Sequence, residues 1–418
     1  MSDLPRRRAV SLLAALALLA SAAAAELAEL SPERRARLEE LVGEVERLRG
    51  LEAPERFEVR VVDADGLAEE VEALMVRDLP AEDLRAAGRA LELFGLLPPG
   101  FDLADVLRRL LGDQIAGFFD PDRELLVLVD GLDVPGLEER TVMVHELTHL
   151  VQHAHFDLRK MLTDDPLSDR DAAVQAMVEG DATLVMVEDL LGDAAQGGPW
   201  LDLLTGDAAG LAGSAAGLDP DLAGYPRYLR ESLIFPYVQG LRFCAAVREA
   251  GGQELLDRAF GVSPPSSSEQ ILHPEKWLAG SDPPIEIELP ELDALLARRL
   301  RAQGSLGEND LRILLAERLP GADPESVGAA AQGWGGDRFA LYGDEPGDVL
   351  VWITEWDTEE DAAEFATLAF EAFPEPAAVR TSPTRVVVVL GGPPEDPELL
   401  VSVLAAARAQ KKTRSIDQ

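Results

Sequence analysis

Two histidines and a glutamate stand close together at residues 145–149, which read HELTH, an instance of H-E-x-x-H. The surrounding residues predict a helix over about 137–156. Positions i and i+4 of a helix lie about 40° apart around the axis and about 6 Å apart along it, so His145 and His149 can bind one metal ion. Glu146 is placed beside them to take a proton from a metal-bound water. The motif therefore predicts a metal-assisted hydrolytic centre.

The helix that carries the motif is expected to be buried on most sides, because residues 142–144 before the motif and 150–151 after it are apolar. Buried histidine and glutamate side chains cost free energy unless a partner such as a metal ion satisfies them. Zinc lowers the pKa of a bound water from 15.7 to about 7–9, so Glu146 could generate hydroxide at neutral pH. We expect one Zn²⁺ per chain. The alternative is a chance match, which is uncommon in a chain with only 5 histidines among 418 residues.

A catalytic zinc usually has three protein ligands and a water, so a third ligand is needed. Glu179 lies in MVEGDAT, residues 177–183, on the next predicted helix at about 169–191. An antiparallel return would bring this helix back beside the HELTH helix, and Gly180 would allow a close approach between helices. The apolar neighbours of Glu179 argue against a solvated side chain. We expect Glu179 to be the third ligand.

Two further histidines follow the motif. The metzincin pattern would have a glycine at position 152 and a third histidine at position 155. This chain has the histidine, His155, but Gln152 stands in place of the glycine. A continuous helix would turn His155 about 120° away from His149, so we do not expect it to be a ligand. His153 could share the face of His149, but a histidine in such a series is more often solvated.

The segment 1–25 has the pattern of a secretory signal peptide. Residues 6–8 are arginines, the run 9–25 is apolar and uncharged, and alanines at 23–25 offer a cleavage site before Glu26. An uncleaved anchor is the alternative, although the run is short and alanine-rich for a membrane span. We expect an exported protein, periplasmic or secreted, with no stable membrane anchor after signal cleavage.

The chain is strongly acidic, with 77 Asp and Glu residues against 38 Lys and Arg and a formal net charge of −39. A surface of this sign does not suit the phosphate backbone of nucleic acid or an anionic membrane face. The single cysteine, Cys244, excludes an intrachain disulfide and a cysteine-rich metal site. Because of the acidic charge, we expect no nucleic-acid partner.

Helices and strands alternate in two predicted globular parts, which together make an α+β protein. The first part, 26–285, contains the motif helices, and a smaller α+β part, 286–418, follows a boundary rich in proline. Residues 193–224, rich in Gly, Ala and Asp, predict a mobile loop. A hairpin is predicted at 115–119 and 125–129. In the second part we expect helices near 291–303, 306–318, 358–372 and 397–409 and strands near 338–343, 348–355 and 384–391.

HELTH followed by EGDA at residues 179–182 resembles the gluzincin zinc metallopeptidases, and more narrowly exported bacterial members of the peptidase MA-like group. The strings AGFFDP, HELTHLVQHAHFDL, FPYVQG, SSEQILHPEKW and AAQGWGGDRFALY extend the resemblance over most of the mature chain. It implies a zincin-like catalytic domain, with a small sheet, an active-site helix and a helical subdomain. It also implies that His145, His149 and Glu179 bind zinc and that Glu146 is the general base.

The chain departs from the gluzincin pattern at one position. Many gluzincins carry an aspartate four residues after the ligand glutamate, where it orients a zinc-binding histidine, and Thr183 stands there in this chain. Asp181 is two residues after Glu179 and about 200° round the helix. We do not expect Asp181 to orient a ligand histidine.

The resemblance implies two more features of the site. Gluzincins usually supply a Tyr or His that donates to the oxyanion, and we rank His273 first and Tyr237 second for this role. An edge strand beside the zinc pairs with the substrate backbone in this architecture, and residues 115–119 would be that strand. A purely structural hairpin is the alternative.

These features predict a zinc-dependent endopeptidase that acts on a protein or peptide substrate outside the cytoplasm, through zinc-bound water activated by Glu146. The alternative is a non-catalytic zinc-binding envelope scaffold, or a partner-binding protein on a zincin fold. A purely structural zinc site would not need Glu146, and this residue is present.

Overall fold

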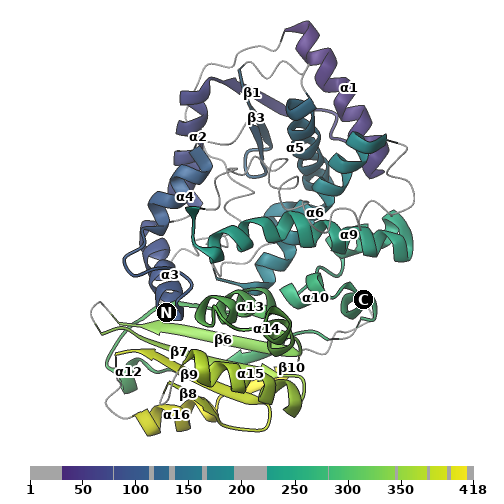
Figure 1. The fold of residues 1–418 in the computed structure, drawn as a ribbon. Coiled ribbons are helices and arrows are strands. Elements are labelled where there is room, and N and C mark those ends of the chain that lie inside the picture. Colours follow the sequence, from purple (N-terminus) through teal and green to yellow (C-terminus); the bar gives the residue numbers. More distant parts are fainter. Residues whose placement is uncertain are drawn as a thin grey trace, which may run out of the picture.

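The computed structural model has the mixed α+β architecture that the sequence predicts (Figure 1). The predicted signal peptide and almost all of the predicted loop at 193–224 lie outside the residues that it describes. None of the described helices is long and apolar enough to cross a membrane. The described residues are 31–78, 80–112, 117–130, 137–161, 167–192, 224–280, 282–343, 347–373, 377–392 and 397–411.

A three-stranded sheet stands beside the motif helix in the first part of the chain. Strand β3 (Leu125–Val129) is central, with β1 (Glu58–Val62) parallel to it on one side and β2 (Gly117–Asp120) antiparallel on the other. The predicted hairpin is therefore confirmed, and β2 is an edge strand of this sheet. Helix α5 (Leu137–Phe156), which carries HELTH, contacts β2 and has the predicted bounds.

Helix α1 opens the described chain with both capping signals in place. The side chain of Ser31 accepts a hydrogen bond from the backbone N–H of Arg34 at 3.2 Å, and Pro32 occupies the first helical position. Gly50 ends the helix in the left-handed region with φ 77°. The helices of this region are α1 (Pro32–Arg49), α2 (Ala64–Asp78), α3 (Ala81–Phe94) and α4 (Leu103–Gly112).

Two long helices lie between the small sheet and the C-terminal sheet (Figure 1). Helix α6 (Asp169–Leu191) is buried over most of its length, and α9 (Arg227–Gly261) packs against it. They meet at Gly180 and Gly240, where the two backbones touch. A Cβ atom added to Gly180 would lie 2.0 Å from the carbonyl carbon of Gly240, so only glycine fits at this crossing.

The C-terminal part contains a five-stranded antiparallel sheet of order β5-β6-β7-β9-β8. Helices α13, α14 and α15 cover one face and α12 and α16 the other, so β7 is buried on both sides. The strands are β5 (Leu300–Gly304), β6 (Trp334–Tyr342), β7 (Val349–Trp356), β8 (Ala378–Arg380) and β9 (Arg385–Gly391). The helices are α12 (Asp293–Leu296), α13 (Gly307–Arg318), α14 (Pro324–Ala331), α15 (Glu359–Ala372) and α16 (Pro397–Ala405).

Two of the predicted helices in this part are wrong over their second halves. The helix expected at 291–303 ends at Leu296, because Ala297 is left-handed, and residues 300–304 form β5 against β6. The helix expected at 397–409 ends at Ala405. After it, β10 (Arg408–Lys411) pairs antiparallel with β4 (Ile285–Glu288). In both places strand pairing overrides the helix propensity of the local sequence.

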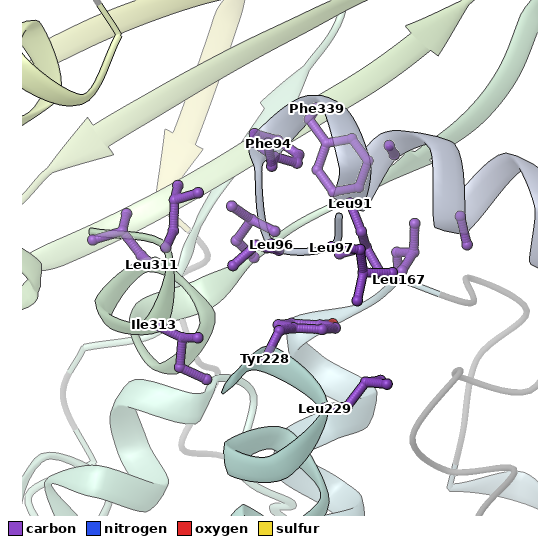
Figure 2. Close-up of a cluster of buried hydrophobic side chains, with 14 of the residues drawn as sticks. Leu91, Phe94, Leu96, Leu97, Leu167, Tyr228, Leu229, Leu311, Ile313 and Phe339 are labelled. Atoms are coloured by element: carbon purple, nitrogen blue, oxygen red, sulfur yellow. The ribbon is translucent and has the colours of Figure 1, made fainter. Parts of the chain in front are cut away.

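A single hydrophobic cluster joins residues from both sides of the predicted boundary (Figure 2). Phe94, at the end of α3, packs edge-to-face on Phe339 of β6 at 5.2 Å and on Trp352 of β7 at 5.3 Å between ring centroids. The turn after α3 adds Leu96 and Leu97. The boundary at 285/286 stays a prediction, and the core is continuous across it.

We predict that Gly180→Ala lowers the free energy of unfolding by about 3 kcal/mol or more, because the new methyl group would overlap the backbone of α9. Chemical denaturation measures the change. The matched control is Gly43→Ala in α1, where an added methyl group meets no atom within 4 Å and should raise stability by about 0.5–1 kcal/mol. Equal stability of Gly180→Ala and the wild type would contradict the close crossing.

Candidate metal centre

Helices α5 and α6 bring three predicted ligands together. His145 and His149 lie one turn apart on α5, and Glu179 faces them from α6. Their exposed fractions are 5%, 1% and 1%, so all three side chains are buried. A buried cluster of this kind needs internal partners for its polar atoms, because water does not supply them.

The three ligand atoms converge on one point. His145 Nε2 lies 3.0 Å from Glu179 Oε2 and 3.1 Å from His149 Nε2, and His149 Nε2 lies 3.5 Å from Glu179 Oε2. Ligands about 2.0–2.1 Å from a tetrahedral zinc are about 3.3 Å apart, close to these distances. The group His145, His149 and Glu179 could therefore bind a metal ion.

Unpartnered atoms in the cluster also fit a cation. Among the described residues, Glu179 Oε1 is buried without a hydrogen-bond partner, and so is His145 Nδ1. A buried carboxylate oxygen without a donor costs free energy, which a bound cation would offset. When both rings are neutral with the proton on Nδ1, the facing Nε2 atoms of His145 and His149 present two lone pairs to each other, and a metal ion between them would remove that repulsion.

The orientation of His149 is set by Gln152, one turn further along α5. The amide nitrogen of Gln152 donates to Val178 O at 3.0 Å and to Asp181 Oδ2 at 2.9 Å. Its Oε1 therefore faces His149 Nδ1 at 2.8 Å and accepts the proton there. This tautomer leaves the lone pair of His149 on Nε2, toward the cluster. Asp181 thus contacts Gln152 rather than His149, and its link to His149 is indirect.

Gln152 is the site residue that sequence reasoning missed. The sequence pattern singles out Gln152 only because a metzincin has glycine at this position. The available signal was its spacing, since a residue three positions after His149 on a helix lies within reach of that side chain.

Glu146 sits beside the cluster and is held by the edge strand. The backbone N–H of Phe119 in β2 donates to Glu146 Oε2 at 2.9 Å. Desolvation raises the pKa of Glu146, the electrostatic interaction with the neighbouring imidazoles lowers it, and the charge of Glu179 raises it again. Within the described residues, this contact places β2, part of the predicted substrate strand at 115–119, next to the expected general base.

Tyr237 reaches the cluster from α9. Its ring centroid lies 6.0 Å from that of His145 with an interplanar angle of 37°. Burial raises its pKa well above the usual value, and the carboxylates of Glu179 and Glu146 raise it further. The hydroxyl therefore stays protonated at neutral pH and can donate a hydrogen bond. The close crossing at Gly180 and Gly240 holds α9, and with it Tyr237, against α6, which carries Glu179.

The structure does not bring His273 to the cluster. Its Nε2 lies 2.9 Å from Glu308 Oε1 on α13 and its Nδ1 lies 3.8 Å from Glu275. The hydrogen bond to Glu308 raises the pKa of His273 against the effect of burial. His273 stands between the short helices α10 (Ser268–Leu272) and α11 (Pro274–Leu278), which direct its ring toward α13 rather than toward α5. The contacts thus place Tyr237 beside the cluster and His273 beside Glu308, which favours Tyr237 over His273 as the candidate donor.

The two other histidines of α5 also lie outside the cluster. His155 Nε2 bonds the carbonyl oxygen of Glu52 at 2.8 Å, in keeping with the expectation that it is not a ligand. His153 is buried, with its ring centroid 5.6 Å from that of Phe119. The expectation of a solvated His153 is wrong, because the hairpin covers this face of α5.

A second group of carboxylates, Glu269, Asp282 and Asp357, also lies within ligand distance of one another. Lys276 stands among them, with its Nζ 2.7 Å from Glu269 and Asp282 and 3.6 Å from Asp357. The ammonium group occupies the position among the carboxylates and offsets part of their negative charge. The group is therefore an ion-pair cluster that ties α10 and α11 to the C-terminal part.

Known proteins offer limited comparisons with this chain. A family model described as a domain of unknown function, DUF8575, matches residues 297–401, well under half of the chain. No curated protein matches the sequence. Over part of its length the chain is similar to a crystal structure described as a "putative hydrolase with a novel fold" from Chloroflexus aurantiacus, at 18% identity and a TM-score of 0.34. That similarity covers 60% of this chain and 92% of that chain.

We predict that zinc affinity rises about tenfold per pH unit from about pH 6.5 toward pH 9. Burial alone would lower the pKa of His149, but the charge and hydrogen bond of Glu179 and the charge of Glu146 raise it from 6.5 to about 9. Below that pH the metal-free site holds a proton on His149, which zinc must displace. Competition with a chromophoric chelator of known pH dependence measures the affinity. An affinity independent of pH over this range would contradict the assignment of His149 as a ligand.

Proposed function

We propose that the protein is an exported zinc metallopeptidase that hydrolyses peptide bonds in proteins or peptides outside the cytoplasm. The observation that carries the proposal is the convergence of His145, His149 and Glu179 on one point, with Glu146 directly beside them. Two histidines and one carboxylate are a ligand set of catalytic zinc, which leaves a coordination position open. The leader pattern at 1–25 supports the exported location.

The residues around the ligands supply the acid–base chemistry of peptide hydrolysis. A Zn²⁺ held by His145, His149 and Glu179 would supply a Lewis acid that favours loss of a proton from water and polarises the substrate carbonyl. Glu146 takes the proton from the attacking water and returns it to the leaving amine. Its pKa, raised by desolvation, suits a group that must both accept and donate a proton.

Tyr237 has the properties of the donor to the developing oxyanion. Its hydroxyl remains protonated near neutral pH, and its ring lies next to His145. A donor that is fixed before the reaction stabilises the negative charge without reorganisation. The close contact between α6 and α9 provides this rigidity.

The edge of β2 supports a peptide as the substrate. β2 is the last strand of its sheet, and the backbone N–H of Phe119 turns away from β3 toward Glu146. An extended peptide that pairs along this edge would run past the catalytic carboxylate. Backbone pairing of this kind recognises peptides with little dependence on their side chains.

We predict that Glu146→Gln keeps about one zinc per chain and lowers the rate of peptide hydrolysis at least 10²-fold. The amide preserves shape but cannot accept the proton of water. Inductively coupled plasma mass spectrometry gives the metal content, and cleavage of casein and of a quenched fluorescent peptide library gives the rate. The companion variant Glu179→Ala should lose zinc. Wild-type cleavage by Glu146→Gln would rule out the peptidase and favour a non-catalytic zinc scaffold.

We predict that Tyr237→Phe lowers kcat by about 10–10³-fold with little change in KM, because the hydroxyl acts only as charge develops on the carbonyl oxygen. His273→Gln is the matched control, since His273 bonds Glu308 on α13, and its kcat should stay near that of the wild type. Steady-state kinetics on one fluorogenic peptide tests both variants. A larger loss in His273→Gln than in Tyr237→Phe would reverse the assignment.

A further inference from the structure

Arg49 is a fully buried cation at the end of α1, with an exposed fraction of 1%. Its Nε donates to Asp181 Oδ2 on α6 at 2.6 Å, and its Nη1 donates to Asp257 Oδ1 on α9 at 2.7 Å. The guanidinium carbon also lies 5.9 Å from the ring centroid of Phe156 and 5.5 Å from that of Phe260. One side chain of α1 thus contacts α5, α6 and α9.

Hydrogen bonds link Arg49 to His149, and the donors on both sides point toward Asp181. Asp181 Oδ2 accepts from Arg49 Nε and from Gln152 Nε2, and Gln152 Oε1 accepts from His149 Nδ1. A buried carboxylate without a cation is costly, so Arg49 is what keeps Asp181 available as an acceptor inside the protein. An acceptor at that point fixes the Gln152 amide with its nitrogen toward Asp181 and its oxygen toward His149.

We propose that Arg49 is a positioning residue for the metal centre, acting through Asp181 and Gln152 to hold His149 with its Nε2 lone pair toward the metal. This inference rests on the proposed metal binding by His145, His149 and Glu179. Groups that orient a ligand histidine typically change metal affinity by about 10–100-fold when they are removed. Arg49 would exert this effect through three successive hydrogen bonds, from a helix that carries none of the three candidate ligands.

A purely structural Arg49 would give a different pattern. An arginine that only joins α1 to α6 and α9 would affect stability, and its effect on zinc affinity would not depend on Gln152. A positioning Arg49 acts through Gln152, so removal of Gln152 should abolish its effect on affinity. The two roles are therefore separated by a double-mutant cycle.

The experiment uses the full mature chain and the variants Arg49→Met, Arg49→Lys, Gln152→Met and the double variant Arg49→Met/Gln152→Met. Zn²⁺ affinity is measured by chelator competition, and the absorption spectrum of the Co²⁺-loaded protein reports the ligand geometry. Circular dichroism confirms folding and gives Tm. The matched control is Arg385→Met, which removes another buried arginine, paired with Glu355 in the C-terminal part.

We expect Arg49→Met and Gln152→Met each to weaken zinc binding about 10–100-fold and to change the Co²⁺ spectrum in the same way. The double variant should be no weaker than either single variant. Arg49→Lys keeps the charge and should restore part of the affinity. Arg385→Met should lower Tm and leave both metal readouts unchanged.

Unchanged affinity and spectrum in Arg49→Met would overturn the positioning role and leave the metal centre intact. Additive losses in the double variant would also overturn it, since Arg49 would then act without Gln152. Should Arg49→Met not fold, the same cycle with Arg49→Lys decides between coupling and additivity. A wild-type protein that binds no zinc would overturn both this inference and the proposed function.

Discussion

The direct backbone contact between α6 and α9 at Gly180 and Gly240 is the constraint on which the site depends. Side chains normally keep helix axes about 8–10 Å apart, and a glycine pair allows a closer approach. The contact lies one residue after Glu179 and three residues after Tyr237, so it sets where both side chains can reach. Helix α5 also packs against α6, so the candidate ligands and the tyrosine are held together by the packing of α5 and α9 on α6.

The packing of these helices also determines the electrostatic interactions among the clustered side chains. Two carboxylates and two imidazoles share a space from which water is largely excluded, and interactions between charges are stronger there than at the surface. The charges of Glu179 and Glu146 raise the pKa of His149 to about 9, and His149 in turn helps to lower the pKa of Glu179 to about 2, although burial acts against both shifts. In the absence of metal a proton can thus balance part of the charge that a cation would otherwise balance.

The local parts of the site could be predicted from the sequence, and the non-local parts could not. His145, His149 and Glu146 follow from helical geometry alone, and the helices at 137–156 and 169–191 have the predicted bounds because their apolar residues require burial. The spacing of Gln152 from His149 is a local signal, but the bond between Gln152 and Asp181 connects two helices and could not be predicted from local sequence. The orientation of a side chain such as His273 depends on a contact with α13, for which the local sequence carries no signal.

The same limit explains the errors in secondary structure. Residues 297–304 read ARRLRAQG, and most of the residues before the glycine favour helices in isolation. Their pairing with β6 depends on a partner more distant in the chain. Strands that alternate or run apolar, such as β7 and β9, were predictable because burial marks them directly.

The pairing of β4 with β10 gives the C-terminal part a property that its sheet alone would not have. Residues 285–288 and 408–411 form one antiparallel ladder, so the chain enters and leaves this part at the same place. Adjacent entry and exit points are the arrangement that tolerates transplantation of a unit into another protein, or rejoining of its ends in a new order. The shared core opposes such exchange, because removal of this part would expose Phe94 and the leucines that follow it, so the two parts are tied through packing although the chain joins them at one place.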